Sequence, residues 1–319
     1  MTQDDTRQET RRKDQQDSQR ETTGQRCGFV AIIGAPNAGK STLVNSLVGA
    51  KVSIVTHKVQ TTRTRVRAIA IVGRSQVIFV DTPGIFRPRR KLDEAMVDAA
   101  WAGAADADVV AMLADARKGL DDDNRRILEG LKKTGREAIL VLNKIDLIDK
   151  GRLLELAEAF NAELDFAATF MVSALKGQGV ADLRHYLAEH MPEGPWLYPE
   201  DQVSDFPLRM LAAEITREKL YLRLHDELPY ASHVETELWD ERPDGSIRIE
   251  QVIYVLRESQ KKIIIGKGGQ TIKEIGQAAR KELSELLGGR KVHLFLFVKV
   301  REKWDRDPER LRNMGLLGD

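Results

Sequence analysis

Short apolar runs alternate with stretches of helical periodicity over more than half of the chain. The runs occupy residues 29–33, 77–80, 109–113, 138–142 and 170–172, and each has the length and composition of a buried strand. Between them, residues 91–104 and 151–160 repeat apolar side chains at helical spacing. This alternation predicts an open, mostly parallel α/β sheet with helices on both faces. Only three residues, 73–75, separate the apolar segments 66–72 and 76–80, so we expect one antiparallel edge strand.

The pattern stops at residues 192–199, where four prolines and glycines cannot continue a helix or a central strand. Beyond this point the sequence predicts a helix at 206–224, strands at 232–239 and 246–255, a helical stretch with a second glycine loop, and a strand at 292–300. The order is α, β, β, α, α, β. We therefore expect an α/β domain at 27–192, a linker at 193–204, an α+β domain at 205–303 and a C-terminal tail at 304–319.

Residues 1–26 carry charged and amide side chains with almost no aliphatic ones, and this composition predicts a disordered tail. The whole chain has 50 Lys and Arg against 49 Asp and Glu, so a nucleic-acid surface would have to be a local patch. A single cysteine, the absence of a signal-peptide core and the lack of any apolar run of about 18 residues predict a cytoplasmic protein without a membrane span.

A glycine loop follows the first strand and opens a helix at residues 41–48. Its sequence, from Gly34 to Ser41, matches G-x-x-x-x-G-K-[ST]. In this motif the glycines free backbone N–H groups to surround phosphate, the lysine (Lys40) reaches the β and γ phosphates, and the serine (Ser41) ligates Mg²⁺. The alternative is that this segment is only a solvent-exposed glycine turn, but its position between a predicted strand and a predicted helix argues against that.

Two further loops follow the strands at 77–80 and 138–142. In the first, Asp81 can hold a metal-bound water and Gly84 can offer its N–H to the γ phosphate, although Asp-Thr-Pro-Gly is also a good turn sequence. In the second, Asp146 can accept two hydrogen bonds from guanine that adenine cannot supply. Lys144 can lie over the base, and Asn143 can tie this loop to the phosphate loop.

These motifs, with Gln60-Thr-Thr-Arg63 and Ser173-Ala-Leu175, resemble in their order the Ras-related GTPase superfamily. The resemblance implies that Thr62 joins the Mg²⁺ shell and that Ala174 donates its N–H to guanine O6, although the sequence alone does not exclude Thr61. The residues expected to contact GTP or GDP are Gly34, Ala35, Pro36, Asn37, Ala38, Gly39, Lys40, Ser41, Asp81, Thr82, Pro83, Gly84, Ile85, Asn143, Lys144, Ile145, Asp146, Ser173, Ala174 and Leu175.

Ile85 follows Gly84 where Ras-like enzymes place the glutamine that orients the attacking water. Relatives with an apolar residue there carry an asparagine at the position of Asn37, which helps to hold a potassium ion. The resemblance therefore implies slow hydrolysis stimulated by K⁺, while the alternative is that Asn37 only shapes a tight turn. The residues expected to contribute to catalysis are Asn37, Lys40, Thr62, Asp81, Gly84 and Ile85.

The second glycine loop, Gly266-Lys-Gly-Gly269, lies between an apolar segment and a second helix. A G-x-x-G turn lets backbone approach a sugar-phosphate chain, and with the element order above it resembles a type II KH domain. Cations outnumber carboxylates over residues 257–303, as binding to phosphate requires, although each lysine taken alone is more simply a solvated residue. The residues expected to contact RNA are Lys261, Lys262, Gly266, Lys267, Gly268, Gly269 and Lys273.

One GTPase domain followed by one KH domain, with the terminal sequence Arg310-Leu-Arg-Asn-Met-Gly315, resembles the Era-type bacterial GTPases. The resemblance implies a monomer that binds the 3′ end of 16S ribosomal RNA, assists maturation of the 30S subunit, and has peripheral contact with the cytoplasmic face of the inner membrane. We expect GTP to order the loops around Thr62 and Ile85 and so to reposition the KH domain. The alternative is an RNA-binding scaffold that is insensitive to nucleotide, and a third possibility, an ATP-driven RNA remodeller, conflicts with Asp146.

Overall fold

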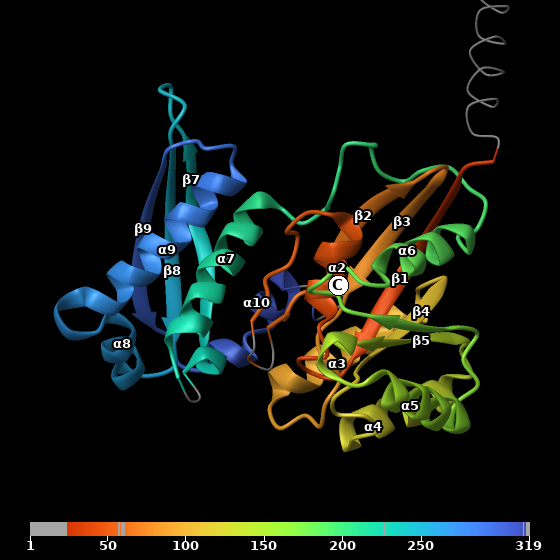
Figure 1. Cartoon of the computed structure of the whole chain (residues 1–319). Coiled ribbons are helices and arrows are strands. Elements are labelled where there is room, and N and C mark those ends of the chain that lie inside the picture. Colours follow the sequence, from red (N-terminus) through yellow and green to blue (C-terminus); the bar gives the residue numbers. More distant parts are fainter. Residues whose placement is uncertain (1–23, 57, 59–60, 226–227, 315, 317–319) are drawn as a thin grey trace, which may run out of the picture.

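The structure, a computed structural model, describes residues 24–56, 58, 61–225, 228–314 and 316. All but the last three residues of the segment expected to be disordered, 1–26, lie outside the described residues. The described chain forms an N-terminal α/β domain and a C-terminal α+β domain that lie side by side (Figure 1). The two domains are in extensive contact.

The N-terminal domain is built on a six-stranded sheet in the order β2-β3-β1-β4-β5-β6. Its strands are β1 (Arg26–Gly34), β2 (Val66–Val72), β3 (Ser75–Asp81), β4 (Val109–Asp115), β5 (Ala138–Asn143) and β6 (Thr169–Val172). All neighbours pair in parallel except β2, which pairs antiparallel to β3 at the edge of the sheet. The mostly parallel sheet and its one antiparallel edge strand are both confirmed.

Helices cover both faces of this sheet, as expected. On one face, α2 (Lys40–Val48) and α6 (Val180–Glu189) bury an apolar cluster against the strands. On the other face, α3 (Lys91–Ala105), α4 (Asp122–Thr134) and α5 (Lys150–Glu163) bury a second cluster. The continuous apolar strands need cover on both faces, which is why their sequences do not alternate with polar residues.

The C-terminal domain has the predicted order of elements. It contains α7 (Leu208–Arg223), the 3₁₀ turn η2 (Pro229–Ala231), β7 (Ser232–Glu241), β8 (Ile247–Val255), α8 (Glu258–Ile265), the turn η3 (Lys267–Gly269), α9 (Gln270–Leu286) and β9 (Val292–Val300). The three-stranded sheet has the order β7-β8-β9, with the first pair antiparallel and the second parallel. Helices α7 and α9 lie beside each other and pack on one face of the sheet (Figure 1).

The C-terminal segment is packed between the two domains, which corrects the expectation of a tail at 304–319. It forms the turn η4 (Trp304–Arg306) and the helix α10 (Pro308–Asn313), and Figure 1 shows α10 at the junction of the domains. Trp304 is only 1% exposed, and it shares an apolar cluster with Leu92 and Met96 of α3 and with Val252 of β8. The segment therefore contributes to the interface between the two domains.

The linker is also packed on the first domain. Gln76, a fully buried residue of β3, accepts hydrogen bonds from the backbone N–H groups of Leu197 and Tyr198 at 2.8 and 3.0 Å. Its own amide group donates to the carbonyl of Tyr198 at 2.8 Å. The linker thus satisfies a buried amide. No helix within the described residues combines the length and the apolar character needed to cross a membrane.

Candidate functional site

The first glycine loop joins β1 to α2 with the geometry that phosphate binding requires. Gly39 has φ of 102°, and a Cβ atom there would lie 2.3 Å from the Asn143 side-chain nitrogen, so only glycine fits. The buried ammonium group of Lys40 donates to the carbonyls of Gly34 and Ala35 at 3.0 and 3.1 Å. Burial lowers the pKa of Lys40 to about 8, and the nearby charge of Asp81 opposes this shift. A bound phosphate group would supply a negatively charged partner for this ammonium group.

Three oxygen atoms converge beside Lys40 in an arrangement that fits Mg²⁺. The hydroxyl oxygens of Ser41 and Thr62 are 2.7 Å apart, and Thr62 Oγ1 is 3.4 Å from Asp81 Oδ2. Asp81 is fully buried, and its other oxygen, Oδ1, has no hydrogen-bond partner among the described residues. Burial raises the pKa of Asp81, against the effect of Lys40. A carboxylate and two hydroxyls are hard oxygen ligands, and Mg²⁺ usually completes such a set with phosphate oxygens and water.

The geometry separates Thr62, the expected metal ligand, from Thr61, which the sequence did not exclude. Thr61 turns its hydroxyl away from this cluster, donating to the carbonyl of Lys58 at 2.8 Å and lying 2.7 Å from the hydroxyl of Thr56. Thr62 instead faces Ser41, as described above. The structure therefore places Thr62, and not Thr61, where a metal ligand would stand.

Asn143 ties the loop after β5 to the glycine loop, as expected. Its amide nitrogen donates to the carbonyl of Ala38 at 2.8 Å. Its oxygen accepts the N–H of Ala174 at 3.0 Å. This second bond differs from the expectation that Ala174 donates to guanine, because the N–H already has an acceptor. Ala174 holds Asn143 in place in this structure.

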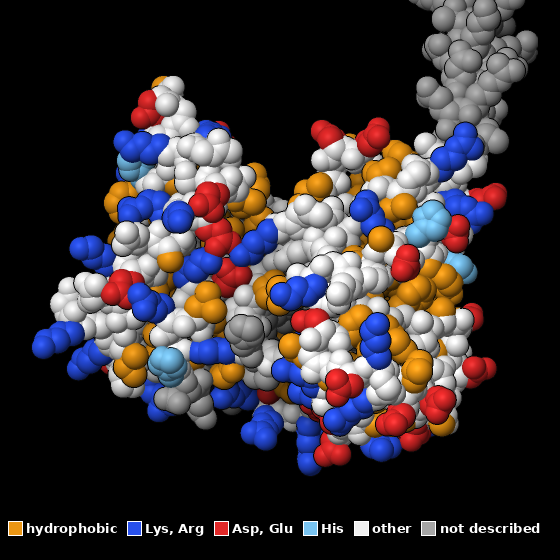
Figure 2. Space-filling model, in the orientation of Figure 1, with side chains coloured by type: hydrophobic (Ala, Val, Ile, Leu, Met, Phe, Trp, Pro, Cys, Tyr) orange, Lys and Arg blue, Asp and Glu red, His pale blue; other side chains and the backbone are white. Residues whose placement is uncertain are grey.

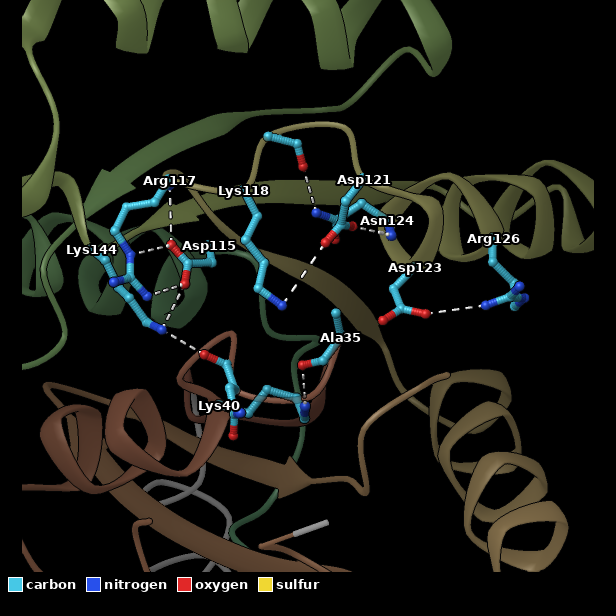
Figure 3. Close-up of polar contacts among 12 residues, drawn as sticks. Ala35, Lys40, Asp115, Arg117, Lys118, Asp121, Asp123, Asn124, Arg126 and Lys144 are labelled. Carbon is cyan, nitrogen blue, oxygen red and sulfur yellow. Dashed lines mark hydrogen bonds and ion pairs between the residues drawn. The ribbon is translucent and has the colours of Figure 1, made fainter. Parts of the chain in front are cut away.

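Lys144 and Asp115 form a pair that the sequence did not reveal. The ammonium group of Lys144 donates to the carbonyl of Asn37 at 2.6 Å and to Asp115 at 2.7 Å, while Arg117 donates to the same carboxylate at 2.8 Å (Figure 3). Burial alone would raise the pKa of Asp115, but the hydrogen bonds from Arg117 and Lys144 outweigh it and hold this pKa at about 2. The only signal in the sequence was the place of Asp115 at the end of a buried strand.

Asp146 lies close to this pair but has no ion-pair partner among the described residues, and its side chain is exposed. A free carboxylate on the turn η1 (Ile145–Leu147) can accept both donors of a guanine edge. Leu175, on the neighbouring loop, is 78% exposed. Ser173 and Thr82 are fully buried, and Thr82 donates to the carbonyl of Ile32 at 2.8 Å, so both have structural roles here.

The loop after β3 approaches the glycine loop through its backbone. The N–H of Ile85 donates to the carbonyl of Gly34 at 3.0 Å, and a Cβ atom on Gly84 would lie 3.1 Å from the backbone nitrogen of Pro36. The Ile85 side chain is 1% exposed and packs in the apolar core with Ala35. Ile85 therefore has no polar group with which to orient a water, and its side chain is buried in the apolar core.

The second glycine loop exposes its backbone at the end of the C-terminal domain. Gly266 has φ of 74°, and a Cβ atom there would lie 2.2 Å from the hydroxyl of Thr271. Gly268 and Gly269 have φ of 60° and 78°, and a Cβ atom on either would meet nothing within 4 Å. The loop is therefore held at its first glycine and open at the other two, where another chain can approach.

Basic side chains surround this open backbone. Lys262, Lys267 and Lys273 are exposed, Lys261 is half-buried, and none of the four is in an ion pair within the described part of the chain. Figure 2 shows blue side chains along this edge of the molecule, over α8. Ile264 anchors α8 in the core while Ile263 is 57% exposed. An open backbone with free cations and an apolar side chain beside it is the arrangement that a KH domain offers to single-stranded RNA.

Two family models match the chain, one for each domain. The model described as "50S ribosome-binding GTPase" matches residues 29–144. The model described as "KH domain" matches residues 227–305. Together they cover the first glycine loop, the loop after β3 and the second glycine loop.

Curated relatives and solved structures match most of the chain. GTPase Era of Brucella suis is 64% identical over 93% of this chain and 95% of that protein, and GTPase Era of Rhizobium meliloti is 66% identical over 91% and 93%. A crystal structure of Era with MgGDPNP and nucleotides 1506–1542 of 16S ribosomal RNA has a TM-score of 0.87, with 39% identity over 92% of this chain and all of that one. A variant of Aquifex aeolicus Era bound to GDP and aluminium fluoride has the same TM-score at 40% identity and the same coverage.

Proposed function

This chain belongs to the Era family of GTPases, and on that premise we propose that it binds and hydrolyses GTP with Mg²⁺ and binds the 3′ end of 16S ribosomal RNA through its KH domain. Its role is to assist maturation of the 30S subunit as a switch controlled by nucleotide. The observation that carries the proposal is the convergence of Ser41, Thr62 and Asp81 beside Lys40, in one chain with an open G-x-x-G loop.

The residues of the nucleotide site divide the work of binding and hydrolysis. Backbone N–H groups of the glycine loop and the ammonium group of Lys40 bind the phosphates, and Asp146 selects guanine. Ser41, Thr62 and Asp81 would hold Mg²⁺, which when bound neutralises charge on the phosphates. Gly84 offers its N–H to the γ phosphate, so the loop after β3 follows the presence of that group.

We also propose that K⁺ stimulates a slow hydrolysis, because Ile85 supplies no polar group and Asn37 lies in the glycine loop. Asn37 has φ of 64°, which equally suits the alternative that it only shapes the turn. Turnover measured in matched potassium and sodium buffers separates the two. A clear excess in potassium supports the proposal, and equal rates would reject it.

Finer proposals concern location and assembly. The protein acts as a monomer in the cytoplasm, on the 30S subunit, and contacts the cytoplasmic face of the inner membrane peripherally. The support for membrane contact is the basic run at residues 87–91, which is exposed along its length. Sedimentation with purified 30S subunits and with anionic vesicles tests the two contacts separately.

Asp146→Asn gives a direct test of the enzymatic part. The amide cannot accept both guanine donors but can pair with xanthine, so GTP turnover should fall by about 100-fold or more while XTP turnover appears. Glu163→Gln, a change on the exposed surface of the same domain, is the matched control and should leave GTP turnover unaltered. Unchanged turnover of GTP in Asp146→Asn would mean that the base is recognised elsewhere.

Crosslinking followed by sequencing of the bound cellular RNA tests the proposed RNA binding. The proposal expects reads concentrated at the 3′ end of 16S ribosomal RNA. Reads spread over unrelated transcripts would contradict it and would favour the nucleotide-insensitive scaffold.

A further inference from the structure

The residues on both sides of Thr62 are held by the KH domain. Arg63 is 1% exposed although it follows the candidate metal ligand directly. Its guanidinium group donates to the carbonyls of Ser232 and Tyr230 at 2.8 and 3.0 Å and to the hydroxyl of Tyr221 at 3.0 Å. All three acceptors belong to the C-terminal domain.

The peptide before Thr62 is held in the same way. Arg217 of α7 is fully buried, and its guanidinium group donates to the carbonyl of Thr61 while Glu214 holds it from the other side. The next residue of α7, Glu218, accepts the N–H of Val55 at 2.9 Å. The segment that carries Thr62 is therefore fastened to α7 at more than one point.

Trp304 links this contact to the helix that follows the second phosphate-sensing loop. Its ring lies 5.7 Å from the guanidinium carbon of Arg63, and its indole N–H donates to the carbonyl of Ala231 at 3.2 Å. On its other side Trp304 packs with Leu92 and Met96 of α3, the helix that begins shortly after Gly84 and Ile85. One buried side chain thus touches both the Arg63 contact and the helix that follows the γ-phosphate loop.

Helix α7 in turn contacts the helix that starts at the RNA loop. Lys219 of α7 is paired with Glu282 of α9, and Lys51 of the first domain is paired with both Glu282 and Glu218. Helix α9 begins directly after Gly269. A continuous set of contacts therefore runs from Thr62 through α7 to the second glycine loop.

We propose that Arg63 and Arg217 are positioning residues by which the KH domain holds Thr62 at the metal site and through which the nucleotide state sets the position of the KH domain. The inference rests on the proposed function and names the residues that couple its two halves. A nucleotide that pulls Thr62 toward Ser41 keeps Arg63 in its pocket, and release of Thr62 frees the arginine and loosens α7.

The chemistry of the pocket makes this contact all-or-none. Partial withdrawal of Arg63 would leave a buried cation without acceptors and the buried carbonyl of Ser232 without a donor, and both are unfavourable. The arginine is therefore either fully inserted or fully in water. A contact with two discrete states can couple the nucleotide state to the position of the KH domain.

The test is the ratio of RNA affinities in two nucleotide states. Binding of an RNA fragment from the 3′ end of 16S ribosomal RNA is measured by fluorescence anisotropy with a non-hydrolysable GTP analogue and with GDP. For the wild-type protein we expect a ratio of about 5 to 150, the usual range of coupling. Arg63→Ala should bring the ratio within about twofold of one and lower kcat for GTP without raising KM, while GDP affinity stays unchanged.

Arg67→Ala is the matched control, because Arg67 lies a few residues further along on β2, is exposed, and pairs with Asp205 at 3.3 Å instead of entering the pocket of Arg63. It should keep the wild-type ratio. Tyr221→Phe removes one acceptor with no change of shape and should lower the ratio partly, so it tests the inference even where Arg63→Ala fails to fold. Arg217→Lys should also lower the ratio, because a lysine lacks the planar fork that joins Thr61 to Glu214.

The outcomes separate the inference from the function on which it rests. A wild-type protein that discriminates between the nucleotide states, together with a folded Arg63→Ala and a Tyr221→Phe that discriminate equally well, would overturn the inference alone. A wild-type protein with equal RNA affinity in both states would overturn the proposed switch itself.

Discussion

The buried ammonium group of Lys40 favours the binding of an anion. Its ammonium group is buried and donates to two backbone carbonyls, and burial brings its pKa down to about 8. Bound phosphate oxygens carry the opposite charge and must raise that pKa. Binding is therefore coupled to proton uptake whenever the solution pH is near the pKa of the free protein.

The expected sign and size follow from that pKa. At pH 8 about half of the free protein carries an uncharged Lys40, so GDP binding should take up about half a proton, and the affinity should decline as the pH rises above 8. Calorimetry in two buffers with different ionisation enthalpies measures the uptake. At pH 6.5 the contribution from Lys40 should vanish, and an uptake that does not differ between the two pH values would show that Lys40 is already fully charged in the free protein.

At this scale the sequence predicted the residues that belong to recognisable motifs. Lys40, Asp81 and Asn143 were found because each sits in a motif of fixed spacing, and their geometry supports the predicted roles. Asp115 was missed because one of its two partners, Lys144, comes from another loop. Arg63 was missed as a contact for the same reason, since its acceptors lie about 160 residues further along the chain.

Among the elements, η3 and the start of α9 carry the RNA prediction. Gly266 fixes the turn, and Lys267 is exposed beside two glycines whose backbone is open. A lysine that meets a phosphate contributes affinity by releasing counterions, and this contribution does not depend on the base sequence.

Lys267→Ala should therefore weaken RNA binding and reduce the slope of log affinity against log salt by about one. GTP turnover without RNA should not change, because the loop is far from the nucleotide site in the chain and in the fold (Figure 1). Lys133→Ala, an exposed lysine on α4 of the other domain, serves as the matched control and should leave the slope unaltered. An unchanged slope in Lys267→Ala would exclude this lysine from phosphate contact.

The sequence predicted the strands and the order of elements correctly, but it missed the packing of the C-terminal segment. Buried strands such as β3 can be predicted because their central residues, here 77–80, are all apolar. In α10 the apolar residues are few and are separated by charged ones, and they become buried only against α3 and β8. A solvated tail and a packed C-terminal segment have similar sequences when the surface against which the segment packs belongs to another domain.

At the scale of the whole molecule, two kinds of contact join the domains. One consists mainly of polar side chains, and the other consists mainly of apolar ones. Arg63 and Arg217 hold the Thr62 segment to α7, while Trp304 and α10 join α3 to the β7–β8 sheet. The segment that carries Thr62 and the helix that follows the Gly84 loop are therefore both in contact with the C-terminal domain. Neither contact could be read from periodicity, because each one exists only in the assembled fold.

The most direct test of the account compares the affinity of the full chain for an RNA fragment of the 16S 3′ end in the presence of a GTP analogue and of GDP, with a scrambled fragment of equal length as the reference. We predict binding at least about fivefold tighter with the analogue than with GDP, and a much smaller difference for the scrambled RNA. Equal affinities in the two nucleotide states would show that the GTPase domain does not control the KH domain, and would contradict the central claim.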